Sequence, residues 1–420
     1  MSWRELPDLL AIGLLIYAFV TVSRPSGTPV TRLWLAGWSC IELHFLAASF
    51  AELQGNWGFL AGIVDSSALI WCALLFTWSM DPRRSCRDTR VLFGSMAVVY
   101  TVYIALASMD KPPRTLLVVA ASLFAWVPLV IMARTSRETW SNGRWFWVAL
   151  NVALAAALLI WQFSAHGPDL MFVVPLNVVY LGCCLQFCLS HRRGTGGFAI
   201  TSIGLFAWSL VFPLGMAFDV YLPQVHVDAE VWNLPKYLVA VGMILLLLED
   251  QLRQNKHLAQ HDALTGLPNR RLFEDRLTGA MERARRDRAQ MALLAIDLDG
   301  FKNVNDTLGH HLGDRLLQHV SAQLGKGVRS IDTVARTGGD EFCVVLEAPI
   351  DRDDAARIAA ALSGKLKVPL EIAGRTVHVG ASIGLAMFPS DAPALTALTH
   401  LADQRMYEAK RSGGSAVCAG

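Results

Sequence analysis

Long runs without charged residues dominate the first 250 residues of this 420-residue chain, and they decide what it can fold into. The hydrocarbon core of a bilayer is about 30 Å thick, which a helix of about 20 apolar residues crosses. Backbone amides in lipid must be paired internally, as they are in a helix. The sequence therefore predicts an all-α transmembrane bundle of about nine helices in residues 1–248. The runs lie near 9–23, 33–51, 57–80, 91–109, 115–133, 145–165, 170–190, 198–218 and 234–248.

Charge is unevenly divided along the chain. The first 250 residues hold 15 basic and 15 acidic side chains, whereas the remaining 170 residues hold 22 and 20. The second share is close to the roughly 25% of charged residues in an ordinary soluble protein. We therefore expect lipid around the first part and water around the second. The net charge of +2 leaves neither part strongly basic, so we expect no nucleic-acid partner.

Positive charge alternates between the connectors of these runs, and this predicts the topology. Lys and Arg are enriched in cytoplasmic loops. The alternate connectors hold only two basic residues, Lys111 and Arg114. The pattern predicts an outside N-terminus and a cytoplasmic C-terminal domain, with eight spans as the alternative if the first run lies in the interface. The rich connectors hold Arg24, Arg32, Arg83, Arg84, Arg87, Arg90, Arg134, Arg137, Arg144, Arg192 and Arg193.

Six polar side chains fall at or near membrane depth. Ionisable groups there are candidates for a functional site, and hydrogen bonds that hold the helices together are the alternative. Lys236, in the last run, is expected to extend its ammonium to the interface. The pattern identifies no ligand. The six residues are Glu42, His44, Asp65, Asn151, Gln162 and Asn177.

Residues 249–261 join the two parts as a predicted signalling helix. Leu245, Leu248, Leu252, Asn255 and Ala259 follow a 3-4-3-4 spacing, which is typical of a short coiled-coil seam. A plain amphipathic linker helix fits this short stretch equally well.

Residues 262–420 have the pattern of one α/β domain. We expect a strand at 291–299, a helix at about 308–328, a hairpin around 333–347 and a strand at 378–388. Gly338 and Gly339 fall at the turn of the hairpin, where we expect the positive φ angles of a tight turn.

Acidic residues follow that turn and also end the first strand of the domain. Asp340 and Glu341 come after the glycines, and Asp297 and Asp299 flank Leu298. We expect Asp297 and Asp299 to point to opposite faces, so that only one of them faces a shared site. If the strand lies beside the hairpin, Asp297 and Asp340 converge on Mg²⁺, which prefers oxygen ligands. A solvated acidic turn is the alternative.

Residues 336–342, Arg-Thr-Gly-Gly-Asp-Glu-Phe, strongly resemble the signature of GGDEF-domain diguanylate cyclases, which join two GTP into cyclic di-GMP and pyrophosphate. Three further segments resemble the family in order. Residues 262–271 match its opening motif, 297–314 its metal and guanine segment, and 402–410 its closing helix. The resemblance covers about 260–415 and implies a ferredoxin-like fold of the nucleotidyl-cyclase and polymerase-palm type.

The resemblance also implies the residues that bind metal and assist catalysis. Mg²⁺, with Mn²⁺ as the alternative, would be held by Asp297, the Leu298 carbonyl and Asp340, with Glu341 next to the metals. Asp340 or Glu341 would assist proton removal, and the sequence does not choose between them.

The implied substrate residues lie in three segments. Asn305 and Asp314 would read the guanine edge, to which an amide and a carboxylate are suited, and His310 would lie near them. Lys302 and Lys410 would contact phosphates. The backbone at Gly338 and Gly339 would approach the phosphates closely.

The resemblance further implies regulation and assembly. One domain holds one GTP while the reaction uses two, so an active homodimer is expected. Arg329 and Asp332 match an RxxD element at which cyclic di-GMP, the product, acts as an allosteric inhibitor; a surface ion pair is the alternative. Gly414 stands where the family often has Arg, which implies one lost phosphate contact unless Arg411 replaces it.

We therefore interpret the chain as a diguanylate cyclase anchored in the bacterial inner membrane, with its GGDEF domain in the cytoplasm. We expect no phosphodiesterase domain after residue 420. A catalytically inactive GGDEF receptor that binds GTP or cyclic di-GMP is the first alternative. A transporter with a cyclase-like tail is the second, although no internal repeat supports it.

Overall fold

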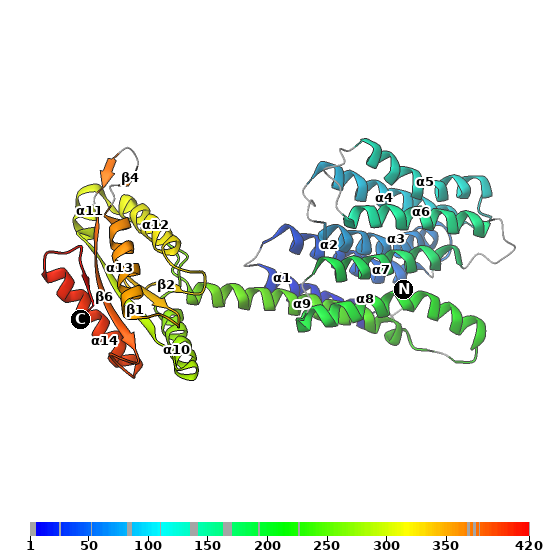
Figure 1. Ribbon diagram of the computed structural model, residues 1–420. Coiled ribbons are helices and arrows are strands. Elements are labelled where there is room, and N and C mark those ends of the chain that lie inside the picture. Colours follow the sequence, from blue (N-terminus) through cyan, green and yellow to red (C-terminus); the bar gives the residue numbers. More distant parts are fainter. Residues whose placement is uncertain are drawn as a thin grey trace. The chain divides into compact units, whose positions relative to one another are not determined.

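The computed structural model describes most of the chain, which divides into two compact units, Met1–Leu252 and Arg253–Gly420. We call them the helical unit and the C-terminal unit (Figure 1). The described residues are 6–24, 27–51, 53–81, 86–109, 111–134, 142–162, 170–191, 194–225, 227–367, 370–372, 375–377 and 379–419.

Nine described helices lie at the positions of the nine apolar runs. Eight of them are long and apolar enough to cross a membrane, by length and composition, and α6 has a shorter apolar stretch, Trp145–Ile160. Arg83, Arg84, Arg137, Arg192 and Arg193 lie outside the described residues, as do the side chains of Arg144 and Gln162. The helices are α1 (Leu6–Ser23), α2 (Pro29–Ala51), α3 (Asn56–Ser79), α4 (Arg87–Ala107), α5 (Arg114–Arg134), α6 (Asn142–Gln162), α7 (Leu170–Ser190), α8 (Gly196–Tyr221) and α9 (Ala229–Gln260).

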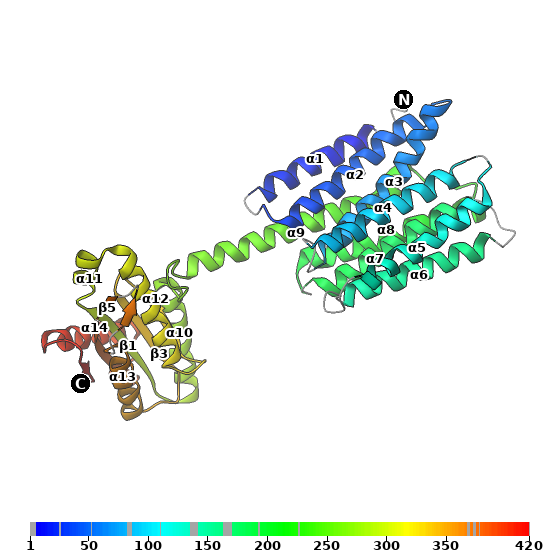
Figure 2. The same ribbon diagram turned by 90° about the horizontal axis from the view of Figure 1, so that it is seen from above.

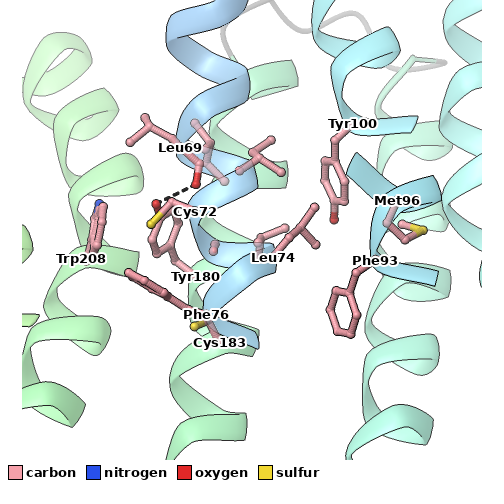
Figure 3. Packing of buried hydrophobic residues seen from close by; sticks show 14 of the residues in the cluster. Leu69, Cys72, Leu74, Phe76, Phe93, Met96, Tyr100, Tyr180, Cys183 and Trp208 are labelled. Carbon is pink, nitrogen blue, oxygen red and sulfur yellow. Dashed lines mark hydrogen bonds between the residues drawn. The ribbon is translucent and has the colours of Figure 1, made fainter. Parts of the chain in front are cut away.

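Helices that follow one another along the chain pack side by side, for example α5 with α6 and α7 with α8 (Figure 2). Figure 3 shows α3 between aromatic side chains of α7 and α8 on one side and of α4 on the other. The Tyr180 hydroxyl donates to the carbonyl of Leu69 at 2.8 Å, and its ring lies 4.4 Å from that of Trp208. The core of this unit is therefore aromatic, and it holds both paired groups, such as the Tyr180 hydroxyl, and a buried indole N–H of Trp208 that has no hydrogen-bond partner among the described residues.

Polar side chains of the helical unit pair across helices. The Tyr100 hydroxyl donates to Asn151 at 3.2 Å, and Asn177 donates to the Ser209 carbonyl at 2.7 Å. These contacts match the alternative of hydrogen bonds that hold helices together. The expectation that Lys236 extends to an interface is wrong, because its side chain is buried against Asn233.

The C-terminal unit is built around a five-stranded sheet of order β2-β3-β1-β6-β7, in which only β6 and β7 are parallel. A separate hairpin pairs β4 with β5. The strands are β1 (Met291–Asp299), β2 (Thr333–Arg336), β3 (Glu341–Leu346), β4 (Leu370–Ile372), β5 (Arg375–Val377), β6 (Gly380–Phe388) and β7 (Val417–Cys418). The helices are α10 (Arg270–Asp287), α11 (Phe301–Leu308), α12 (His310–Lys326), α13 (Arg352–Leu366) and α14 (Leu395–Arg411).

Both faces of β1 are covered, which explains its nearly continuous apolar sequence. Leu294 and Ile296 face the core that includes α12 and α13, whereas Leu293 and Ala295 face the core that includes α10 and α14. The strand lies where the sequence predicts it, and the predicted helix at about 308–328 is α12, whereas the preceding α11, which is followed by Gly309 with a φ of 85°, was not predicted.

Candidate active site

The carboxyl end of β1 meets the start of β3, and this junction gathers the predicted acidic residues. Asp297 stands directly opposite Glu341 in the antiparallel register, so their side chains share a face of the sheet. The amide of Leu298 donates to the carbonyl of Asp340 at 3.2 Å. The hairpin thus places Asp340 and Glu341 beside Asp297 and Leu298.

Asp297 is the buried member of this group, with 8% of its surface exposed. Lys410, from α14, donates to its Oδ1 at 2.7 Å. Burial raises the pKa of Asp297, and the nearby charges of Asp340 and Asp299 raise it further, while Lys410 opposes them. The hydrogen bond to Asp297 raises the pKa of Lys410 in turn. The implied phosphate lysine therefore contacts an implied metal ligand in the protein alone.

The prediction that Asp299 faces away from Asp297 is wrong, although the two residues have different partners. Residues two apart in a strand share a face, and Asp299 bonds Ser382, which stands opposite Asp297. The amide of Ser415 donates to Asp299 at 2.6 Å. Asp299 therefore holds the turn that follows α14. Gly414 in that turn has a φ of 75°, and a Cβ there would lie 3.2 Å from the Asp299 carboxyl group.

The hairpin turn is braced by a charged residue whose role the sequence does not reveal. Arg336 donates to the Gly339 carbonyl at 2.7 Å and to Asp262 at 2.9 Å. Burial raises the pKa of Asp262, but hydrogen bonds from Thr265 and Arg336 outweigh this effect and lower the pKa below its ordinary value. The opening motif that contains Asp262 thus fixes the turn. The contact between Arg336 and Asp262 joins two of the motifs that resemble the family. The presence of both residues in those motifs is the only sign of this contact in the sequence.

The two turn glycines do not have the positive φ angles that we expected. A Cβ on Gly338 would lie 2.5 Å from a carboxylate oxygen of Glu341, whereas a Cβ on Gly339 would meet nothing within 4 Å. Gly338 therefore leaves room for the Glu341 side chain in its present position. Gly339 leaves open space at the turn, which suits a ligand that approaches the backbone.

The implied guanine residues meet where α11 and α12 join. Asn305 lies over Gly313, where an added Cβ would be only 1.9 Å from its Oδ1. That oxygen is buried and has no hydrogen-bond partner among the described residues. A buried acceptor without a partner is costly, and this oxygen is such an acceptor within the segment that is implied to bind guanine. Asp314 follows directly after Gly313 and is exposed.

The remaining implied residues lie on the surface or at a distance. Lys302 and His310 are exposed on α11 and α12. Arg329 and Asp332 precede β2 and so lie at the opposite end of that strand from the hairpin. Their side chains form a two-pronged ion pair with distances of 3.2 and 3.1 Å. Asp332 also accepts from the amides of Arg329 and Glu347, both at 2.9 Å.

The chemistry of the donors at the junction fits a hard cation. Carboxylates of Asp297 and Asp340 and the carbonyl of Leu298 are oxygen ligands of the kind Mg²⁺ takes, and this ion draws further ligands from water and phosphates. Among the described residues, no three His, Cys, Asp or Glu side chains lie close enough together to hold a metal ion by themselves. A cation here would therefore need ligands from outside the side chains.

Comparison with known proteins decides the family of this unit. Residues 259–416 match the diguanylate cyclase, GGDEF domain family. They are a GGDEF domain. This confirms the resemblance drawn from the four motifs, and it supports the class of diguanylate cyclases without showing activity.

Two curated relatives come from Pseudomonas aeruginosa. The chain is 41% identical to the bifunctional diguanylate cyclase/cyclic di-GMP phosphodiesterase MucR, over 65% of this chain and 41% of MucR. It is 43% identical to the diguanylate cyclase TpbB, over 39% of this chain and 38% of TpbB. A solved structure of TpbB with only its GGDEF domain is 43% identical, with a TM-score of 0.37, and the match covers 38% of this chain and 92% of that one.

The chain thus spans about two fifths of the length of these two curated relatives. The match to MucR covers more of the chain than the GGDEF domain does. It therefore extends into the helical unit.

Proposed function

We propose that the protein is a membrane-anchored diguanylate cyclase that converts two GTP into cyclic di-GMP and two pyrophosphates. The observation that carries the proposal is the register of β1 and β3 within a GGDEF domain, which places Asp340 and Glu341 beside Asp297 and Leu298; the buried, unpartnered acceptor of Asn305 adds to it. One set of groups suits phosphates and the other suits a guanine. Asp314 would accept from the N–H groups of the same base.

The reaction balances when two domains face each other. The 3′-hydroxyl of each GTP attacks the α-phosphate of the other, so two phosphodiester bonds form, two pyrophosphates leave and two protons are released. Asp340 or Glu341 would accept the proton from the attacking hydroxyl. Lys302 and Lys410 would hold phosphate oxygens. A homodimer is therefore part of the proposal.

A divalent cation, Mg²⁺ or Mn²⁺, would be held by Asp297, the Leu298 carbonyl, Asp340 and Glu341 and would supply charge neutralisation at the phosphates. In the protein alone, Asp297 is already buried, and the nearby charge of Asp340 contributes to raising its pKa. Arg329 and Asp332 would bind cyclic di-GMP as an inhibitor. Arg329 also lines a cavity of about 560 Å³ with Arg357, and these two cations suit the phosphates of such a ligand.

The helical unit would anchor the enzyme in the bacterial inner membrane with the GGDEF domain in the cytoplasm. Its apolar helices and the arginine-rich connectors support this placement. Anchoring in a plane raises the effective concentration of one domain for another, which favours control of dimer formation by the helical unit.

The deciding experiment is incubation of detergent-purified full-length protein with GTP and Mg²⁺, followed by mass analysis for cyclic di-GMP. Asp340→Ala should abolish the product, and Asp353→Ala, an exposed carboxylate on α13, should not. Binding of GTP or cyclic di-GMP without any product from the wild type would instead establish the inactive receptor.

A further inference from the structure

A buried polar cluster joins four helices of the helical unit. It consists of Asp8 on α1, His44 on α2, Asp65 on α3, and Asn233 and Lys236 on α9. Asp8, Asn233 and Lys236 are each at most 7% exposed. Polar groups in such surroundings cost free energy unless they are paired, and at membrane depth they mark functional sites. The cluster has no part in the proposed cyclase reaction.

The cluster is continuous. Asn233 donates to Asp8 at 2.7 Å, and Lys236 donates to Asn233 at 2.7 Å. The Lys236 ammonium also lies 3.2 Å from Nε2 of His44. On the other side of the ring, Nδ1 of His44 lies 2.6 Å from Oδ1 of Asp65 and 3.3 Å from the backbone carbonyl oxygen of the same residue. A change at Asp65 therefore reaches α9 through two contacts.

The contacts assign the proton on His44. A lysine ammonium only donates, so Nε2 of His44 must accept, and the ring hydrogen lies on Nδ1, toward Asp65. His44 is then neutral. The cluster holds two carboxylates against one ammonium and carries one net negative charge. Asp8 accepts hydrogen bonds from Asn233 and from the Tyr237 hydroxyl, whereas the carboxylate of Asp65 lies beside the neutral ring of His44. Asp65 is therefore the carboxylate at which a further cation would act.

Asp65 also lines a cavity of about 400 Å³. Aromatic rings of Phe59 and Phe172 and hydroxyls of Ser66 and Ser108 line the same space. Ring faces attract a cation, and a carboxylate supplies the opposite charge; both interactions act on a quaternary ammonium ion as well as on one with N–H groups. The cavity therefore has the chemistry of an ammonium site. The absence of any three metal-binding side chains in proximity, among the described residues, argues against a bare metal ion.

We propose that this cavity binds a small organic ammonium ion, and that its binding at Asp65 is relayed through His44 and Lys236 to α9. A bound cation competes with the ring N–H of His44 for the Asp65 carboxylate. A weaker hold on Nδ1 changes the acceptor strength of Nε2 and so the position of Lys236. α9 is the helix that continues to Gln260, at the start of the GGDEF domain.

The proposal goes beyond the cyclase activity and uses the proposed topology only for the side of entry. The cavity lies near the start of α3, the end of α4 and the start of α7. Arginine-poor connectors belong to these helix ends, so the ligand would enter from outside the cytoplasm.

Binding is tested by calorimetry on full-length protein with choline as the probe, at fixed pH. Choline should bind saturably, while its uncharged isostere dimethylbutanol and sodium chloride should not. Asp65→Asn should weaken binding at least tenfold, or about 1.4 kcal/mol. Asp219→Asn, which removes an exposed carboxylate of α8, is the matched control and should bind as the wild type does.

Phe172→Leu guards against a misfolded Asp65 variant, since it keeps the charge and the apolar volume but removes the ring. It should weaken choline binding several-fold at an unchanged melting temperature. Equal binding of choline and dimethylbutanol, or equal weakening by Asp219→Asn, would overturn the site.

The source of the ammonium is distinguished in nanodiscs with and without phosphatidylethanolamine. If choline binds more weakly only in the nanodiscs that contain phosphatidylethanolamine, the site takes a lipid headgroup. If choline binds equally in both, the site takes a free solute. In either case an ammonium occupies the cavity.

The relay is tested by hydrogen–deuterium exchange of α9. Choline should change exchange in wild-type peptides that cover 240–258, and it should not do so in Lys236→Met, although this variant still binds choline. The same change in both proteins would refute the relay. Neither measurement uses GTP, so failure here is distinct from failure of the proposed cyclase.

Discussion

Replacement of Gly313 by alanine tests the role of Asn305 through the backbone beneath it. A Cβ at Gly313 would lie 1.9 Å from Asn305 Oδ1 and 3.4 Å from the ring of Phe301. The second distance is an ordinary contact, but the first requires the amide oxygen to move by about 1.5 Å. Hydrogen bonds extend over only about 2.7–3.2 Å, so this displacement breaks any bond that Oδ1 makes to a base.

The magnitude follows from the hydrogen bonds that Asn305 would lose. A neutral hydrogen bond contributes about 0.5–1.5 kcal/mol, so two lost bonds weaken GTP binding by about 1–3 kcal/mol, or roughly 5- to 150-fold. Alanine in a helix is favoured over glycine by about 1 kcal/mol. The melting temperature should therefore stay close to that of the wild type while the affinity falls.

The assay is binding of a non-hydrolysable GTP analogue, with melting curves of the same samples. Gly325→Ala is the matched control, because it lies in the same helix and its Cβ would meet nothing within 4 Å. Asn305→Ala should add little to Gly313→Ala if both act on the same contact. Equal affinity of Gly313→Ala and Gly325→Ala would refute the guanine role of Asn305.

Three further changes have defined outcomes. Burial raises the pKa of Asp391, but hydrogen bonds from donors that include the Met387 amide outweigh burial and lower the pKa. The stability that this group contributes is complete above about pH 4 and is lost as the pH falls. In Asp391→Asn, the free energy of unfolding from urea titrations should therefore fall less steeply with decreasing pH than in the wild type. Asp332→Asn should cost about 1–3 kcal/mol of unfolding free energy, because its side chain is fully buried, and Arg329→Ala should cost less while both relieve inhibition by cyclic di-GMP. Gly414→Arg should lower the melting temperature without lowering the KM for GTP, since its φ of 75° suits glycine.

Local pattern predicts the elements whose burial is uniform along the chain. The strand at 291–299 is one apolar run covered on both faces, and it lies where it is expected. The break between α11 and α12 was not predicted. Its cause is the backbone conformation of Gly309, and Gly313 receives Asn305 only because of that break.

Lys236 shows why the polar residues of the helical unit were harder to interpret. A lysine in an apolar run is expected to reach water, since its stem is flexible. Its partner His44 is 192 residues away along the chain. Asn233, to which Lys236 donates, in turn donates to Asp8, and those two residues are 225 positions apart. Contacts at such separations leave no trace in hydropathy.

The acidic residues at the end of β1 show how tertiary contacts give different roles to residues that a motif does not distinguish. Asp297 and Asp299 have the same chemistry and lie on the same face of β1. Asp299 accepts hydrogen bonds from the hydroxyl of Ser382 and the amide of Ser415, which hold its carboxylate in place. Asp297 is more buried and has Lys410, an ion that a ligand can displace because nearly half of its side chain is exposed. Burial and like charge make the ionised form of Asp297 costly, which is the physical reason that the proposed cation site is placed at Asp297.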